Sequence, residues 1–134
     1  MSAGQAIRIC FAFLCVSALS TGLPAAFDPV FFFEDFPLGA GWVELLPPYN
    51  EHLVTDVGGL YLGFAIIFGW AAYRLETALV RAVSFGWLLF AVLHFVFHAD
   101  HLEGFGTADA IAELASLGVV TVAPVVAIWA SRES

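Results

Sequence analysis

The chain has 134 residues, enough for one compact domain. Its composition is 61% hydrophobic, 16% aromatic and only 12% charged, which leaves too little polar surface to cover the core of a soluble protein of this size. The formal net charge of −8, with no lysine, argues against binding to nucleic acid or to anionic lipid surfaces. We therefore expect an integral membrane protein in contact with the lipid bilayer.

The first predicted helix covers residues 4–23. Arg8 followed by an apolar run also resembles a signal peptide with a cleavage site after Ala26. However, Pro24 then occupies the −3 position, where signal peptidase prefers a small residue. We favour a helix that is retained in the membrane.

Residues 24–50 form an unusual connection, because large apolar side chains alternate there with acids and prolines. A loop surrounded by water rarely carries so much apolar surface. We expect this segment to lie in the outer membrane interface or to fold back over the mouth of the bundle, and contact with another membrane subunit is the alternative. The residues expected to make these contacts are Phe31, Phe32, Phe33, Phe36 and Trp42.

Three more helices are predicted at residues 51–75, 77–102 and 108–131. Each contains an apolar run of a length suited to a membrane span. A very short turn joins the first two of them, so these must be antiparallel neighbours. Gly59 and Gly63 form a G-x-x-x-G pair, and Gly86 lies in a looser pattern of small residues, which predicts close helix packing at these glycines.

The positions of the arginines predict the topology. Arg8 precedes the apolar run of the first helix, Arg74 and Arg81 flank the turn between the second and third helices, and Arg132 follows the fourth. The other two connections lack arginine and hold most of the twelve acids. By the positive-inside rule both termini are cytoplasmic, and the fold is an all-α, up-down bundle of four transmembrane helices.

Three histidines occur in the apolar stretch HFVFHADH. On a continuous helix His94, His98 and His101 fall at about 0°, 40° and 340° around the axis, so they share one face. The two other outer helix ends carry matching polar positions. His52 and Asp56 lie one turn apart on one of them, and Asp109 and Glu113 share a face of the other. Convergence of these seven side chains would form a cluster of histidines and carboxylates near the outer face.

This cluster has three interpretations. The polar groups could bond across helices and fix their register, each contributing about 0.6–2 kcal/mol. Imidazoles at this spacing, completed by a carboxylate, could instead bind zinc, copper or iron, and a haem is conceivable if His52 opposes another histidine. They could also handle protons or a small ligand. Glu113 is the sharpest case, because a carboxylate one turn inside a transmembrane helix is costly unless it is paired or protonated.

Three stretches of the chain carry a family resemblance: PYNEHLVTDVGGLYLGFA, YRLETALVRAVSFGWLLFAVLHFVFH and HLEGFGTADAIAELASLG. Across residues 48–123 the chain resembles small actinobacterial membrane proteins that are similar to the DoxX-like group. The resemblance implies a four-helix bundle in the bacterial plasma membrane. Some DoxX-like proteins are accessory subunits of respiratory or thiol-redox assemblies. The group supplies no catalytic motif to transfer, and this chain lacks paired cysteines at its outer face.

No motif of a hydrolase, a nucleotide-binding protein or a metalloprotease occurs in the sequence, and we assign no catalytic residue. We expect a non-enzymatic integral membrane protein, an accessory or scaffold subunit that packs against other membrane subunits or against itself. The alternative is a metal- or haem-binding redox or transport component that uses the outer histidines.

Overall fold

The computed structural model describes residues 1–132, which fold into helices with no strand in that range. In chain order the helices are α1 (Ala3–Phe27), α2 (Pro29–Asp35), α3 (Glu51–Arg74), α4 (Thr77–Ala99) and α5 (Thr107–Ala130). All except the short α2 are long and apolar enough to cross a membrane. The predicted all-helical fold with four membrane-length helices is therefore confirmed.

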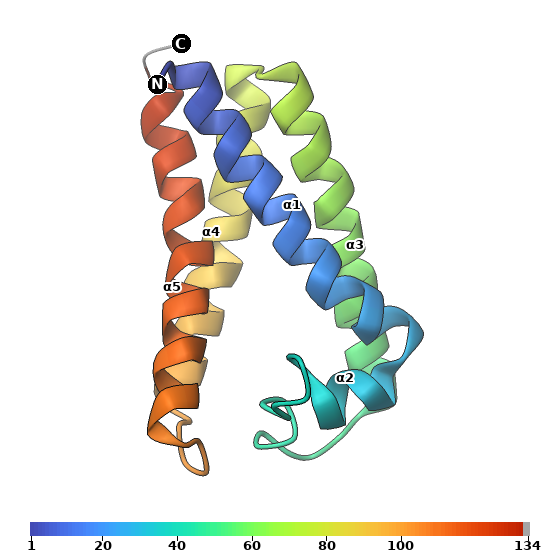
Figure 1. The fold of residues 1–134 in the computed structure, drawn as a ribbon. Coiled ribbons are helices and arrows are strands. Elements are labelled where there is room, and N and C mark those ends of the chain that lie inside the picture. The colour runs from blue at the N-terminus through green and yellow to red at the C-terminus, as the bar shows by residue number, and fades with distance from the viewer. Residues whose placement is uncertain (133–134) are drawn as a thin grey trace.

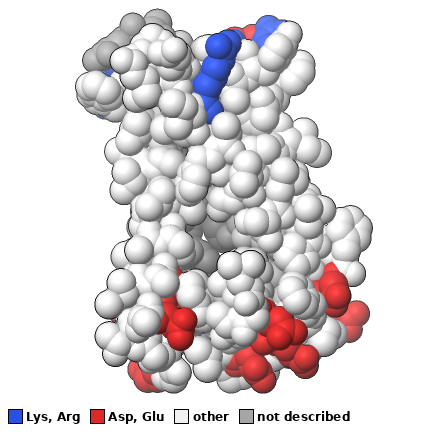
Figure 2. Space-filling view, viewed as in Figure 1, with Lys and Arg blue, Asp and Glu red and all other residues white. Residues whose placement is uncertain are grey.

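The four long helices alternate in direction, so the bundle has two distinct ends (Figure 1). The termini end holds both chain termini and the turn between α3 and α4. The loop end holds α2, the rest of the α1–α3 connection and the α4–α5 connection. On the face shown in Figure 2, the arginine side chains lie at the termini end and most of the carboxylates lie at the loop end.

Local sequence signals set most of the helix boundaries. Ser2 and Gln5 form a capping box that starts α1, and the Asn50 side chain accepts a hydrogen bond from the Leu53 amide at the start of α3. Leu75 adopts a left-handed conformation with φ 55°, which ends α3 and lets α4 begin two residues later. These boundaries lie within a few residues of the predicted ones, except at the end of the first helix.

Two boundaries differ from the prediction in ways that matter for function. α4 ends at Ala99, so the helix predicted to reach residue 102 is shorter and His101 lies beyond it. The chain turns back here to reach α5 and uses a positive φ of 96° at Gly104. Within the predicted interfacial segment a further helix, α2, forms because Asp28 caps it and Pro29 occupies its first turn.

Helix α1 runs beside α5 at the termini end and diverges from it toward the loop end, where it lies against α3 (Figure 1). The close α1–α3 contact depends on two glycines. A Cβ atom on Gly58 would lie 2.3 Å from the Ala26 amide nitrogen, and one on Gly22 would lie 3.1 Å from the Gly58 carbonyl oxygen. Only glycine fits at Gly58, because the neighbouring atoms belong to the backbone and have little freedom to move.

The glycines predicted to mediate packing do not do so within this chain. Added Cβ atoms on Gly59, Gly63 and Gly86 would meet nothing within 4 Å. The glycine that meets another helix is Gly58, which precedes the G-x-x-x-G pair and faces α1, whereas its neighbour Gly59 is turned about 100° away. The period of the pattern does not indicate which face of the helix meets a partner.

The half of the bundle near the termini end is closely packed around aromatic rings. Trp87 of α4 is 1% exposed, and its ring centroid lies 5.1 Å from those of Phe64 and Phe68 on α3. Phe68 in turn stacks on Phe11 of α1 at 5.8 Å. Helix α5 contributes small buried residues instead, including Ala127, so its backbone approaches the others closely.

Hydrogen bonds from arginine side chains link the helices at this end. Arg8 of α1 donates to the Ala72 carbonyl oxygen of α3 at 3.3 Å. Arg81 of α4 donates to the hydroxyl and the carbonyl oxygens of Ser131, just after α5, at 3.1 and 3.0 Å. Both pairs of helices are therefore tied together where the chain begins and ends.

Candidate functional site

The divergence of α1 from α5 leaves a cavity of about 500 Å³ at the loop end. Tyr61 of α3 and Phe90 of α4 line it and also contact Trp87, so the aromatic core forms its inner limit. The walls come from all four long helices, and residues of α2 and the following loop complete the lining. A volume of this size suits a small organic molecule.

One close polar contact lies in the wall of the cavity. His98 Nδ1 on α4 is 2.6 Å from Glu113 Oε1 on α5, and these side chains are 13% and 5% exposed. A hydrogen on that nitrogen would not point at the oxygen as a hydrogen bond requires, so the pair is a close polar contact without hydrogen-bond alignment. The other carboxylate oxygen, Glu113 Oε2, is buried and has no partner among residues 1–132. A buried acceptor of this kind is costly unless something binds it.

His94 extends this polar site toward the core. Its ring stacks on Phe90 with centroids 5.2 Å apart and meets the His98 ring edge-on at 4.5 Å. All three polar residues, His94, His98 and Glu113, line the cavity. Two adjacent turns of α4 and the first turns of α5 therefore place two imidazoles and one carboxylate on the same wall.

The other predicted members of the cluster lie elsewhere. His52 and Asp56 on α3 pair with each other at 3.1 Å, and their side chains are 82% and 59% exposed. His101 lies beyond α4, where its Nδ1 is 2.7 Å from the Phe97 carbonyl oxygen and its ring stacks on Phe97. None of these residues lines the cavity. In residues 1–132, no three histidine, cysteine or acidic side chains are placed to share a metal ion.

The predicted outer segment supplies one side of the cavity. Phe32 of α2 is buried and lines it together with Phe36 and Trp42. Trp42 also donates its indole N–H to Asp109 Oδ1 of α5 at 3.2 Å, which joins this segment to the opposite side of the bundle. The two remaining phenylalanines of the group do not reach the cavity: Phe31 is exposed, and Phe33 packs against Tyr49.

Sequence reasoning missed the polar wall that α1 contributes. Ser17, Ser20 and Thr21 of α1 line the cavity, as do the histidines of α4. Ser20 and Thr21 follow Ser17 by three and four residues, which places all three on one helix face. This spacing is the sequence signal that could have predicted the polar wall. The signal is weak because hydroxyl side chains in a transmembrane helix usually hydrogen-bond to the backbone of their own helix. Ser20, for example, donates to the Ser17 carbonyl oxygen at 2.8 Å.

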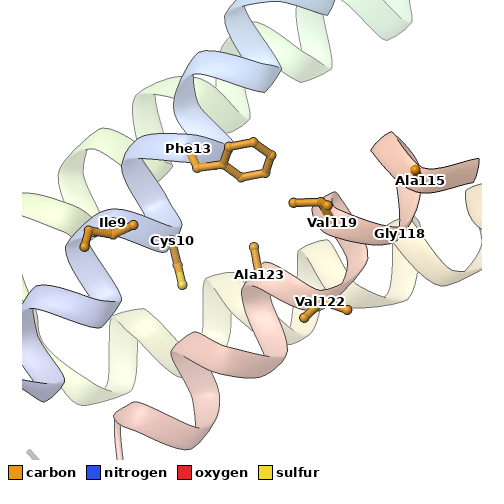
Figure 3. A pocket seen from close by; sticks show the side chains of 8 residues that line it. All are labelled: Ile9, Cys10, Phe13, Ala115, Gly118, Val119, Val122 and Ala123. Carbon is orange, nitrogen blue, oxygen red and sulfur yellow. The ribbon is translucent and has the colours of Figure 1, made fainter. Parts of the chain in front are cut away.

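A second hollow, of about 440 Å³, is a groove between α1 and α5 (Figure 3). Its lining is apolar apart from the Cys10 thiol, and Val119 and Ala123 of α5 face Phe13 and Cys10 of α1 across it. Within the part of the chain that the structure describes, no charged side chain or hydroxyl group lines the groove. It can accommodate hydrocarbon but offers little to select one molecule over another.

The cavity at the loop end therefore combines an apolar, largely aromatic lining with one localised polar site. This arrangement suits the binding of an amphipathic molecule. Among the described residues it contains no nucleophile paired with a base, because the serines and Thr21 that line it make no hydrogen bond to the imidazoles. No family model, no curated protein and no solved structure matches the chain.

Proposed function

We propose that this chain is a non-enzymatic integral membrane protein that holds a small amphipathic molecule in the cavity at its loop end. The observation that carries the proposal is the unpaired oxygen of Glu113, buried in the wall of a cavity of about 500 Å³. Unpaired polar groups inside a membrane protein are costly, and an ionisable group there points to a ligand or ion site. The ligand would supply the missing partner.

The proposal includes the orientation and setting of the protein. All four arginines belong to the termini end, and by the positive-inside rule this end faces the cytoplasm of a bacterial cell. The cavity then opens in the outer half of the plasma membrane, with α2 and its loop as an interfacial cover. The resemblance to DoxX-like proteins supports an accessory role, in which the protein serves a larger, respiratory or other, membrane assembly.

The test is whether the purified protein carries a molecule that depends on the cavity. Ser20 lines the cavity, whereas its neighbour Leu19 does not and is 38% exposed. Ser20→Phe should fill the cavity and remove the bound molecule, and Leu19→Phe should leave it in place. The measurement is native mass spectrometry of protein extracted gently from membranes, followed by identification of the extracted compound.

Two results would overturn the proposal. One is a wild-type protein that carries only ordinary bilayer lipid, in the same amount as the Ser20→Phe variant. The other is stoichiometric zinc or copper, or the absorption band of a haem, that disappears in a His94→Ala/His98→Ala variant. That second result would establish the metal- or haem-binding function instead.

A further inference from the structure

We propose that the molecule held in this cavity is a neutral amphiphile with a hydroxyl head group that hydrogen-bonds to Glu113. The inference rests on the proposed ligand-binding function and names the chemical class of the ligand. It follows from the charges that surround the cavity, from the free oxygen of Glu113 and from the character of the walls.

An anionic head group does not suit this cavity. Among residues 1–132, no lysine or arginine belongs to its lining. Three of the four arginines are engaged elsewhere, because Arg8 and Arg81 bond to residues at the termini end and Arg74 pairs with Glu76. A carboxylate or phosphate would instead be buried next to Glu113, with only the imidazoles of His94 and His98 to offset two negative charges. Fatty acids and anionic phospholipids are thereby disfavoured.

A cationic head group is also a poor match. Glu113 already has His98 Nδ1 at 2.6 Å, so one protonated imidazole would balance its charge. A second cation would then bring an uncompensated charge into the membrane interior. An ammonium group, moreover, only donates hydrogen bonds, so it could not accept the O–H of Glu113 if that carboxyl were protonated.

A hydroxyl group satisfies the site in either protonation state. It donates to Glu113 Oε2 when the carboxylate is ionised and accepts from it when the carboxyl is protonated. Ser17 and Thr21, which α1 contributes to the lining, are able to bond a second oxygen of the ligand. The remaining lining, with Phe32, Phe90 and Tyr61 among it, suits an apolar or aromatic body.

The experiment uses three photoreactive probes that share a 12-carbon chain with a diazirine and differ only in the head group. The head groups are a hydroxyl, an ammonium and a carboxylate. Each probe is added to the full-length protein in lipid nanodiscs, and the labelled residues are identified by mass spectrometry. We expect the hydroxyl probe to label cavity-lining residues at least about tenfold more than either charged probe, because one hydrogen bond to a charged group accounts for such a factor.

Variants then test the role of Glu113. Glu113→Leu should lower cavity labelling by the hydroxyl probe about tenfold, whereas Asp56→Leu, which removes an exposed carboxylate outside the cavity, should not change it. Glu113→Gln keeps the shape and both hydrogen-bonding capacities of the side chain and should retain most of the labelling. The head-group comparison in the wild type needs no variant, so it holds even if Glu113→Leu folds poorly.

Equal or stronger cavity labelling by the ammonium or carboxylate probe would overturn the inference. If no probe labels the cavity while a molecule sensitive to Ser20→Phe is found on the protein, the ligand class is wrong and the proposed function stands. If neither labelling nor such a molecule is found, both are wrong.

Discussion

The two halves of this bundle use the same four helices in opposite ways. Near the termini end, Trp87 and its aromatic neighbours fill the space between the helices, and two arginines tie the helix pairs together. Near the loop end, the α1–α3 and α4–α5 pairs diverge around a cavity. Side chains fill the half near the termini end, whereas they leave a cavity in the half near the loop end.

The comparison shows that a cavity can arise from a single close contact. Gly22 and Gly58 bring α1 against α3 at the loop end, which draws α1 away from α5 (Figure 1). The opening is therefore a consequence of helix crossing and not of missing side chains. Four changes test this division of roles, in order of decreasing expected effect.

The largest effect should come from Trp87→Ala in the closed half. The substitution removes the ring that α3 packs against and leaves an unfilled space, with an expected loss of about 4 kcal/mol in the free energy of unfolding. Phe85→Ala is the matched control, because Phe85 is 57% exposed on the same helix and its removal should change little. Unfolding in mixed micelles, followed by circular dichroism, measures both. Equal losses would show that α4 does not pack as described.

The next largest effect should come from Gly58→Ala, which tests the cause of the divergence. The added methyl group would collide with the α1 backbone at Ala25 and Ala26, with an expected cost of about 2–3 kcal/mol. Gly59→Ala, one residue away, adds a methyl group to open space and should be neutral or stabilising by up to about 1 kcal/mol. The same unfolding assay applies. Similar behaviour of the two variants would contradict the α1–α3 contact.

A smaller effect is expected for the coupling between His98 and Glu113. In a double-mutant cycle with alanine at both positions, the coupling energy should be about 1 kcal/mol, as for other polar contacts between transmembrane helices. The exposed pair His52–Asp56 provides the comparison and should couple by only about 0.3 kcal/mol. A coupling at the buried pair no larger than at the exposed pair would argue against the close contact between α4 and α5.

The smallest effect should come from Trp42→Phe at the cover of the cavity. The variant keeps an aromatic ring but loses the hydrogen bond to Asp109, with an expected cost of about 0.5 kcal/mol. Hydrogen exchange of residues 36–46 should become faster, while the core of α4 should not change. Trp129→Phe, at an exposed position on α5, is the control. Unchanged exchange would show that Trp42 does not hold the segment in place.

The histidine cluster shows how much of the candidate site can be predicted from a sequence pattern. Helical spacing places His94 and His98 on one face, and in the structure their rings meet at 4.5 Å while His98 Nδ1 lies 2.6 Å from Glu113 Oε1 on α5. It could not separate these residues from His52 and Asp56, which have the same spacing on α3 and pair at the exposed surface. Spacing fixes which residues share a face, but not which way that face is turned.

The sequence by itself determined the number of long helices, their approximate boundaries and the separation of arginines from acids, because these depend on local hydropathy, capping and charge. Only the tertiary structure decided that Gly58 and not Gly59 meets another helix, and that Glu113 borders a cavity. Each helix can rotate about its own axis without changing its sequence pattern. The neighbours against which it packs select one rotation, and that choice created the site.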